Sequence, residues 1–340
     1  MSGISSRAGL LLGMAASLCA SSVRADDLRT AQALVESGVF LSHAETDAAF
    51  ARLDGEVASD KAKPDTAPAQ PNAVFWDSAG SSFAQDERAG RLGYSGSETL
   101  MRLGFDRALS TTARVGVMAS AGFGSIASGD LESQTVSRHA NVYGVFTRGP
   151  LFAKLVVGGS LYDFLSLDRG PDNDQSRGST RGTALQAASQ LGTSFRFAGV
   201  KMTPTVALGA YASRVAGYDE CGGAAPLSFN ARDARAAIGS VRLAGSKSVR
   251  LDPNHTVEVQ AFVSAEDVVA FRASTLVATA VDGLKTRLGG AAAPTGRGVV
   301  SGVGLGTDLA PGVNLTVNYD YGLRDGLATH ASRARLGVSF

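Results

Sequence analysis

Apolar and polar residues alternate along most of this chain from residue 73 onward. The alternation is cleanest in residues 313–321, and it recurs in residues 99–106, 114–123 and 257–264. Successive side chains of a strand face opposite sides, so each stretch predicts a strand with one apolar face. The stretches approach the ~9–11 residues that a tilted strand needs to cross a membrane. An all-β fold of membrane-crossing strands is therefore expected, in preference to a soluble sandwich with its shorter strands.

The last nine residues show the same pattern and stop on an aromatic residue. The two faces are Ala334, Leu336, Val338 and Phe340 against Arg333, Arg335, Gly337 and Ser339. A strand that is apolar outside and cationic or small inside is typical of a membrane barrel. This segment is predicted to be the strand that closes the barrel.

Connections of two lengths follow the predicted strands. Short turns come after the strands that end near Leu109, Arg148, Phe197, Val249 and Leu309. The alternate connections are longer and include residues 84–94, 166–182, 216–230 and 267–297. Short periplasmic turns and long surface loops are typical of outer-membrane barrels. The count predicts a 12-stranded antiparallel transmembrane barrel over residues 73–340. In residues 136–146 and 232–243 apolar residues occupy both faces, so the inward side stays open.

The segment before the strands has a helical pattern. In residues 26–60, Phe50, Leu53 and Val57 fall at helical spacing, and Ser42 with Glu45 fits a capping box. The apolar face is narrow, which suits a water-lined lumen; a solvent-exposed arm fits the periodicity equally well. A proline-containing linker follows, so residues 26–72 are predicted to form a helical arm and linker.

The N-terminal residues predict that the chain is exported. Residues 1–25 combine a positive start, a short apolar stretch and a small-residue cleavage site, which predicts a secretory signal peptide. Beyond it there is no apolar run of the ~18 residues that a membrane helix requires. Basic and acidic side chains are then nearly balanced, so nothing favours nucleic acid as a partner. Cys221 is the one cysteine left, which excludes an intrachain disulfide.

Charged residues recur on the polar faces of the predicted strands. Placing a charged side chain in lipid costs several kcal/mol, and a lumen is the environment in which these residues avoid that cost. As a set they are expected to hold the helical arm in a plugged pore, although simple solvation accounts for any one of them. The predicted lumenal charges are Arg102, Lys154, Lys201, Glu258, Asp320, Arg333 and Arg335.

The sequence contains no convincing catalytic constellation. Its four histidines lack metal-ligand spacing, and residues 93–96 do not fit a nucleophile elbow. Asp163, Asp168, Asp172 and Asp174 cluster without a neighbouring histidine, which indicates solvated loop acids or at most a weak cation site. We expect no enzyme, no cofactor and no metal centre.

Four stretches resemble the translocator β-domain of autotransporters, the type V secretion proteins of Gram-negative bacteria. They are residues 48–59, 75–76, 105–109 and 335–340, and the resemblance covers residues 44–340. It implies that a pore helix threads the lumen, with Asp54 and Glu56 near Arg102, Arg333 or Arg335. The implied pore-helix residues are Phe50, Arg52, Leu53, Asp54, Gly55 and Glu56.

The same resemblance implies function and partners. A monomeric barrel in outer-membrane lipid is expected, delivered by periplasmic chaperones and recognised by the barrel-assembly machinery through Leu336, Val338 and Phe340. It would translocate or display a segment at the cell surface. About twenty residues precede the family-like helix, so the passenger is expected to be missing or vestigial. A porin-like channel and an adhesin acting through its long loops are the alternatives.

Overall fold

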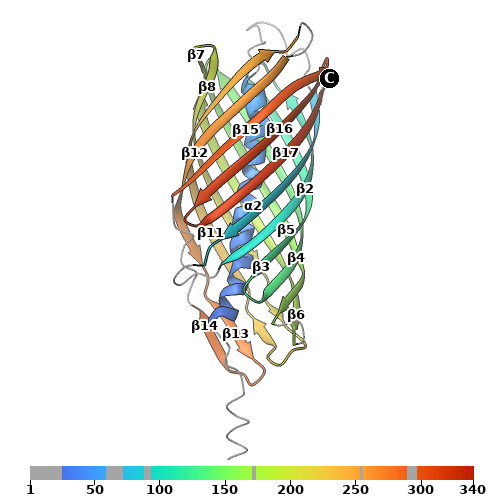
Figure 1. Ribbon diagram of the computed structural model, residues 1–340, viewed down its shortest axis with the longest axis vertical. Coiled ribbons are helices and arrows are strands. Elements are labelled where there is room, and N and C mark those ends of the chain that lie inside the picture. The colour runs from blue at the N-terminus through green and yellow to red at the C-terminus, as the bar shows by residue number, and fades with distance from the viewer. Residues whose placement is uncertain (1–24, 59–71, 88–92, 171–173, 253–255, 289–296) are drawn as a thin grey trace, which may run out of the picture.

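The computed structural model describes residues 25–58, 72–87, 93–170, 174–252, 256–288 and 297–340. It is a barrel with a helix along its interior (Figure 1). The predicted fold class is confirmed: twelve antiparallel strands close on themselves around one N-terminal helix. The predicted signal peptide and the proline-containing linker lie almost wholly outside the described residues.

The barrel strands follow one another around the wall in chain order, and the first strand pairs with the last. They are β1 (Asn72–Gln85), β2 (Tyr94–Ala108), β3 (Ala113–Ser128), β4 (Leu131–Arg148), β5 (Leu151–Arg169), β6 (Ser176–Thr193), β8 (Val200–Val215), β11 (Arg232–Arg250), β12 (Thr256–Ala273), β15 (Arg297–Ala310), β16 (Val313–Arg324) and β17 (Leu327–Ser339). A short strand, β7 (Phe195–Phe197), pairs with β8 at one turn.

A second, four-stranded sheet extends from one end of the barrel (Figure 1). It contains β9 (Tyr218–Asp219), β10 (Leu227–Phe229), β13 (Leu276–Ala280) and β14 (Lys285–Leu288). These strands lie in two connections that were expected to be open loops. Leu227, Phe229 and Leu276 of these strands are buried against the rest of the protein, which gives the small sheet an apolar face.

The predicted asymmetry of the turns is only partly correct. Between β5 and β6 the strands themselves extend to Arg169 and from Ser176, so much of the expected loop is barrel wall. At the same end, β3 and β4 are joined through Gly129 and Asp130 alone, and β16 and β17 through Asp325 and Gly326. Among these, Gly129 and Gly326 adopt positive φ angles of 55° and 82°, which glycine accepts without strain.

The structure assigns the two stretches whose inward face the sequence left open. On β4, His139, Asn141 and Tyr143 are buried in the lumen. On β11, Ala236 and Ile238 both point inward by ordinary alternation, and the register irregularity beside them falls on the partner strand, where Val269 of β12 is the unpaired residue. No helix among the described residues is both long and apolar enough to cross a membrane.

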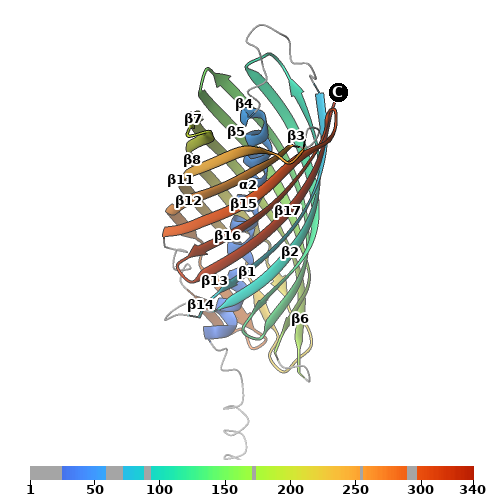
Figure 2. The same ribbon diagram turned by 45° about the horizontal axis from the view of Figure 1, so that its top comes forward.

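Helix α2 (Ala25–Ala58) runs along the lumen for 34 residues (Figures 1 and 2). At ~1.5 Å per residue its length is about 50 Å, enough to traverse the barrel. Its first turns emerge beside β13 and β14, at the end opposite Phe340 (Figure 1). The predicted capping box is wrong, because Ser42 lies mid-helix and donates its hydroxyl hydrogen to the Gly38 carbonyl at 2.8 Å.

Candidate functional site: the helix in the barrel lumen

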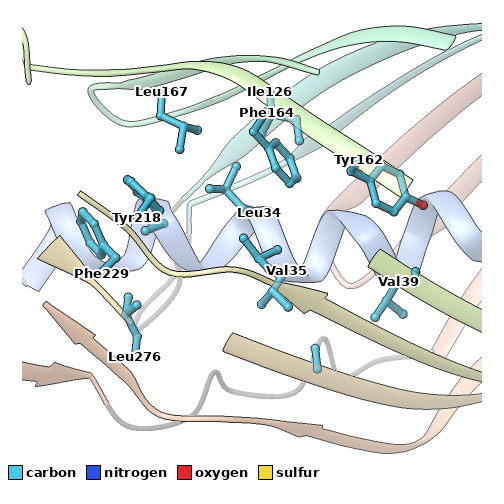
Figure 3. Close-up of a cluster of buried hydrophobic side chains, with 14 of the residues drawn as sticks. Leu34, Val35, Val39, Ile126, Tyr162, Phe164, Leu167, Tyr218, Phe229 and Leu276 are labelled. Carbon is cyan, nitrogen blue, oxygen red and sulfur yellow. The ribbon is translucent and has the colours of Figure 1, made fainter. Parts of the chain in front are cut away.

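Apolar residues of α2 fill the lumen at the end where the helix emerges. Leu34 and Val35 are fully buried, and Phe164 and Tyr162 of β5 pack in the same cluster (Figure 3). The four-stranded sheet contributes further buried side chains, namely Tyr218, Phe229 and Leu276. The side chains that pack around Leu34 and Val35 are therefore largely apolar.

Gly38 marks a close approach between the helix and the wall. A Cβ atom at this position would lie 2.4 Å from the Ser213 Oγ and 3.3 Å from the Ser213 Cβ on β8. One turn later, Ser42 Oγ lies 3.3 Å from the Tyr162 hydroxyl. Only a residue without a side chain allows the helix to pass this close.

A buried ion-pair network joins the middle of the helix to the wall. Arg102 of β2 donates to Glu45 Oε1 from Nε at 2.9 Å and from Nη2 at 2.6 Å, and to Asp77 Oδ1 from Nη1 at 2.6 Å. Ser120 donates to the other Glu45 oxygen at 3.0 Å. None of the three charged side chains is more than 3 % exposed. Every buried charge here has a partner, which is the condition for burial to be tolerated.

A second polar group surrounds His43. Its Nδ1 lies 3.0 Å from the Tyr211 hydroxyl, and its Nε2 lies 3.5 Å from Glu266 and 3.6 Å from Asp47. Arg324 pairs with Glu266. His43, Asp47 and Glu266 offer ligand atoms within 4.8 Å of one another, a spacing that a metal ion can use. Histidine spacing in the sequence could not reveal this group, since Glu266 comes from a distant strand.

The C-terminal half of α2 has its own contacts. Asp54 pairs with Lys154 of β5, whose ammonium also reaches the Phe50 carbonyl at 3.3 Å. Arg52 pairs with Asp106, which accepts a hydrogen bond from the Tyr143 hydroxyl at 2.5 Å.

A second apolar cluster closes this end of the lumen. Phe50 and Leu53 of α2 pack with Phe75 and Phe152 of the wall. The Arg52 guanidinium lies 5.2 Å from the centre of the Phe75 ring. Along the helix, apolar contacts therefore lie on both sides of the polar middle.

The predicted lumenal charges fall on inward-facing or half-buried strand positions. Arg102, Lys154 and Arg335 are buried, Glu258 and Asp320 lie beside Gly306 and Gly302, and Lys201 and Arg333 are half-buried. Of these, Arg102, Lys154 and Arg335 contact the helix.

The predicted partners of Asp54 are only partly correct. Arg335 acts on the Asp54 carboxylate at longer range, but the ion-pair partners of Asp54 are Lys154 and Arg242. Asp54 pairs with Lys154, whereas Arg102, Arg333 and Arg335 converge on Asp77 of β1, at 2.6, 3.8 and 3.3 Å. Arg335 instead reaches the helix through the carbonyls of residues 48 and 51, at 3.5 Å each. Gly55 and Glu56 belong to α2, but their side chains lie outside the described residues.

Three further residues of the lumen were not predicted to lie there. Asp77 is fully buried and could have been found, because it alternates with the outward-facing Trp76. Glu45 was interpreted as a cap. Arg232 of β11 is fully buried and donates a hydrogen bond to the Ala31 carbonyl of the helix. Residues this far apart in the sequence cannot be paired from a local pattern.

The lumen also holds a histidine–serine pair. His139 Nδ1 lies 2.7 Å from the Ser160 Oγ, and both residues are 4 % exposed. A nucleophile needs a substrate within reach, and this pair faces the helix and the wall. The expectation that the chain is not an enzyme stays a prediction.

Comparisons with known proteins agree on one architecture. A family model described as the autotransporter beta-domain matches residues 75–320. The translocator domain of the autotransporter NalP from Neisseria meningitidis is similar in structure, with a TM-score of 0.63 at 17% identity over 87% of this chain and 98% of that one. The beta domain of the Bordetella autotransporter BrkA gives a TM-score of 0.58 at 15% identity over 79% of this chain and 100% of that one. No curated protein sequence gave a match.

Proposed function

The chain belongs to the autotransporter beta-domain family and is an outer-membrane barrel of the type V secretion class, and from this premise we propose that α2 closes the lumen and presents its own N-terminal turns at the cell surface. The observation that carries the proposal is the course of α2, which runs along the lumen for 34 residues.

The direction of the helix supports surface display. Both ends of an outer-membrane barrel with an even number of strands lie in the periplasm. The barrel begins at Asn72 and ends at Phe340, which hydrogen-bond to each other through their backbones at 3.1 and 2.9 Å. The first turns of α2 emerge at the opposite end, beside the four-stranded sheet (Figure 1). The N-terminal turns of α2 would therefore lie at the cell surface.

The contacts of the helix support a closed lumen. Two apolar clusters surround the helix on either side of the polar middle, and ion pairs involving Glu45, Arg52 and Asp54 hold it to two strands of the wall, β2 and β5. Breaking one buried pair costs about 3–5 kcal/mol because the remaining charge is left without a partner. Spontaneous loss of the whole helix would break several at once, so the helix is expected to remain in place.

The closing strand supports the proposed route of assembly. Val338 and Phe340 face outward from β17 and are 41% and 60% exposed, and Leu336 lies on the same face. These residues are proposed to be read by the barrel-assembly machinery after periplasmic chaperones deliver the chain. We further propose that the mature protein acts as a monomer and without catalysis.

Planar-bilayer conductance tests the closed lumen. The full chain is compared with a variant that lacks residues 26–58, after both have shown heat-modifiable migration on a gel as proof of a folded barrel. The intact protein should give no steady current, whereas the deletion variant should open a large steady conductance. A large steady current from the intact protein would overturn the proposal and favour the porin-like channel.

A further inference from the structure

Arginines form an arc on the outer, lipid-facing surface of the barrel. They project outward from one side of the wall, between β4 and β12, and all are exposed. The arc consists of Arg138 on β4, Arg181 on β6, Arg214 on β8, Arg235 on β11 and Arg272 on β12.

The arc lies where the wall leaves the apolar layer. On β8 the outward positions from Met202 to Ala212 carry no charge, and Arg214 is the next outward residue. On β6 the outward positions from Thr193 to Thr183 are likewise uncharged, and Arg181 follows. Such a run matches the ~9–11 residues that a tilted strand needs to cross the membrane. Both arginines follow it at the end away from Phe340, the side of the cell surface.

Two of these arginines directly oppose each other. Arg235 and Arg272 are register partners on β11 and β12, and both side chains are exposed on the outer face. Like charges directly opposite each other across two strands are destabilising unless something neutralises them. Within the part of the chain that the structure describes, neither has an ion-pair partner.

The rest of the arc is only partly neutralised. Arg138 and Arg181 share a single carboxylate, that of Asp163, at 2.7 and 3.2 Å. Arg214 lies 3.9 Å from Asp233, the limit of an ion pair, with both side chains more than half exposed. Positive charge therefore exceeds negative charge along the arc.

The opposite side of the barrel lacks this feature. The outward positions of β16, β17 and β1, taken over the whole of these described strands, hold no Lys, Arg, Asp or Glu. Their ends near the cell surface carry hydroxyl and aromatic groups instead, such as Tyr319, whose hydroxyl lies 2.7 Å from the His330 ring. The arginines are thus gathered on one side of the wall, not spread as a general interfacial ring.

We propose that this arc binds the phosphate groups of phosphorylated lipids in the outer leaflet. A guanidinium offers a planar fork of donors that matches phosphate oxygens, and phosphate bridging Arg235 and Arg272 would remove their mutual repulsion. Lipid head groups are held at this depth, and basic clusters beside membrane-crossing segments recognise anionic ones. The inference rests on the outer-membrane location and orientation of the barrel, and it is independent of whether α2 closes the lumen.

Native mass spectrometry of the detergent-purified full barrel tests the proposal. The probes are bis-phosphorylated lipid A and the same lipid with its phosphates removed. The double variant R235Q/R272Q should bind the phosphorylated lipid at least fivefold more weakly than the parent, whereas both proteins should bind the dephosphorylated lipid equally weakly. The matched control is R107Q/R148Q, which removes two exposed arginines from the periplasmic ends of β2 and β4 and should bind like the parent.

Heat-modifiable migration first establishes that each variant is folded. If R235Q/R272Q does not fold, the single variants R235Q and R272Q are measured in its place, each with an expected loss of at least twofold. Equal binding of the two lipids by the parent, or an equal loss in R107Q/R148Q, would overturn the proposal. Conductance of the variants should not change, which separates this result from a failure of the plug.

Discussion

Arg102 directs two nitrogens at a single oxygen of Glu45, with Nε at 2.9 Å and Nη2 at 2.6 Å from Oε1. One residue belongs to the helix and the other to the barrel wall, and both are almost completely buried. The helix is thus positioned by a charge-assisted contact deep inside the lumen, where water competes least.

Replacing Glu45 with alanine should destabilise the barrel. Arg102 would keep only Asp77 and would lose two hydrogen bonds, so a loss of about 3–5 kcal/mol is expected. The measurement is the temperature at which heat-modifiable migration is lost on a gel, which should fall. Glu132→Ala serves as the control, since Glu132 is exposed on β4. Equal midpoints for the two variants would contradict the role of Glu45.

Asp54 and Lys154 should show energetic coupling. In a double-mutant cycle with Asp54→Asn and Lys154→Met, the coupling free energy is expected to be about 0.5–3 kcal/mol, because the two groups contact each other in the lumen. Asp267 and Arg297 provide the control cycle; they lie 3.7 Å apart with side chains 52% and 92% exposed, and their coupling should be near zero. A lumenal coupling no larger than this surface coupling would argue against an ion pair holding the helix.

Gly38→Leu should displace the helix from the wall. The new side chain would meet Ser213 at distances that atoms do not occupy, so the helix must shift or leave. Planar-bilayer recordings should show new openings in this variant and none in the parent. Adding Ser213→Gly should restore part of the closure, because it removes the atoms that the leucine meets. If Gly38→Leu records like the parent, the close approach has no part in closing the lumen.

Cys221 reports the orientation of the barrel. It is exposed, and it lies between β9 and β10 at the end from which α2 emerges. A membrane-impermeant maleimide should therefore label it on intact cells, and Cys221→Ser should abolish the signal. In the Cys221→Ser background, Thr112→Cys, in the turn between β2 and β3, should be labelled only after the outer membrane is permeabilised. The reverse pattern would invert the proposed topology.

Phe340→Ala should lower the amount of barrel in the outer membrane several-fold. The ring is 60% exposed and faces away from the lumen, so its loss should leave the stability of the folded barrel nearly unchanged. Quantitative immunoblotting of outer-membrane fractions provides the readout. Phe197→Ala is the control, because that ring is 71% exposed at a periplasmic turn and lies outside the closing strand. Comparable yields from both variants would remove the assembly role of Phe340.

The sequence predicted the barrel because most strands face lipid on one side and polar groups on the other. The inward face of a strand could not be predicted from alternation where the lumen is not polar. Tyr143 and Val145 of β4, and Ala236 and Ile238 of β11, point inward and are apolar because the helix, and not water, covers them. Alternation carries no signal at such positions, because apolar residues then occupy both faces of the strand.

The partners of the helix could not be predicted for a related reason. Inward charges such as Arg102 and Arg335 follow from strand parity alone. Which acid each one meets depends on how far α2 enters the lumen and how it is rotated, and neither quantity is encoded in a local pattern. Ser42 and Glu45 lie in the middle of the helix and not in a capping box, so Glu45 is deep in the barrel as a partner for Arg102.

The seam between β1 and β17 also determines when the wall can close. Residues 73–85 pair with residues 327–339, so β1 gains its second neighbour only when β17 has been synthesised and has folded against it. Until then the sheet has two open edges, each a row of unpaired backbone donors and acceptors that other chains can join. A chain truncated before β17 would keep those edges and tend to aggregate. The barrel can therefore close only after the chain has been made through to β17.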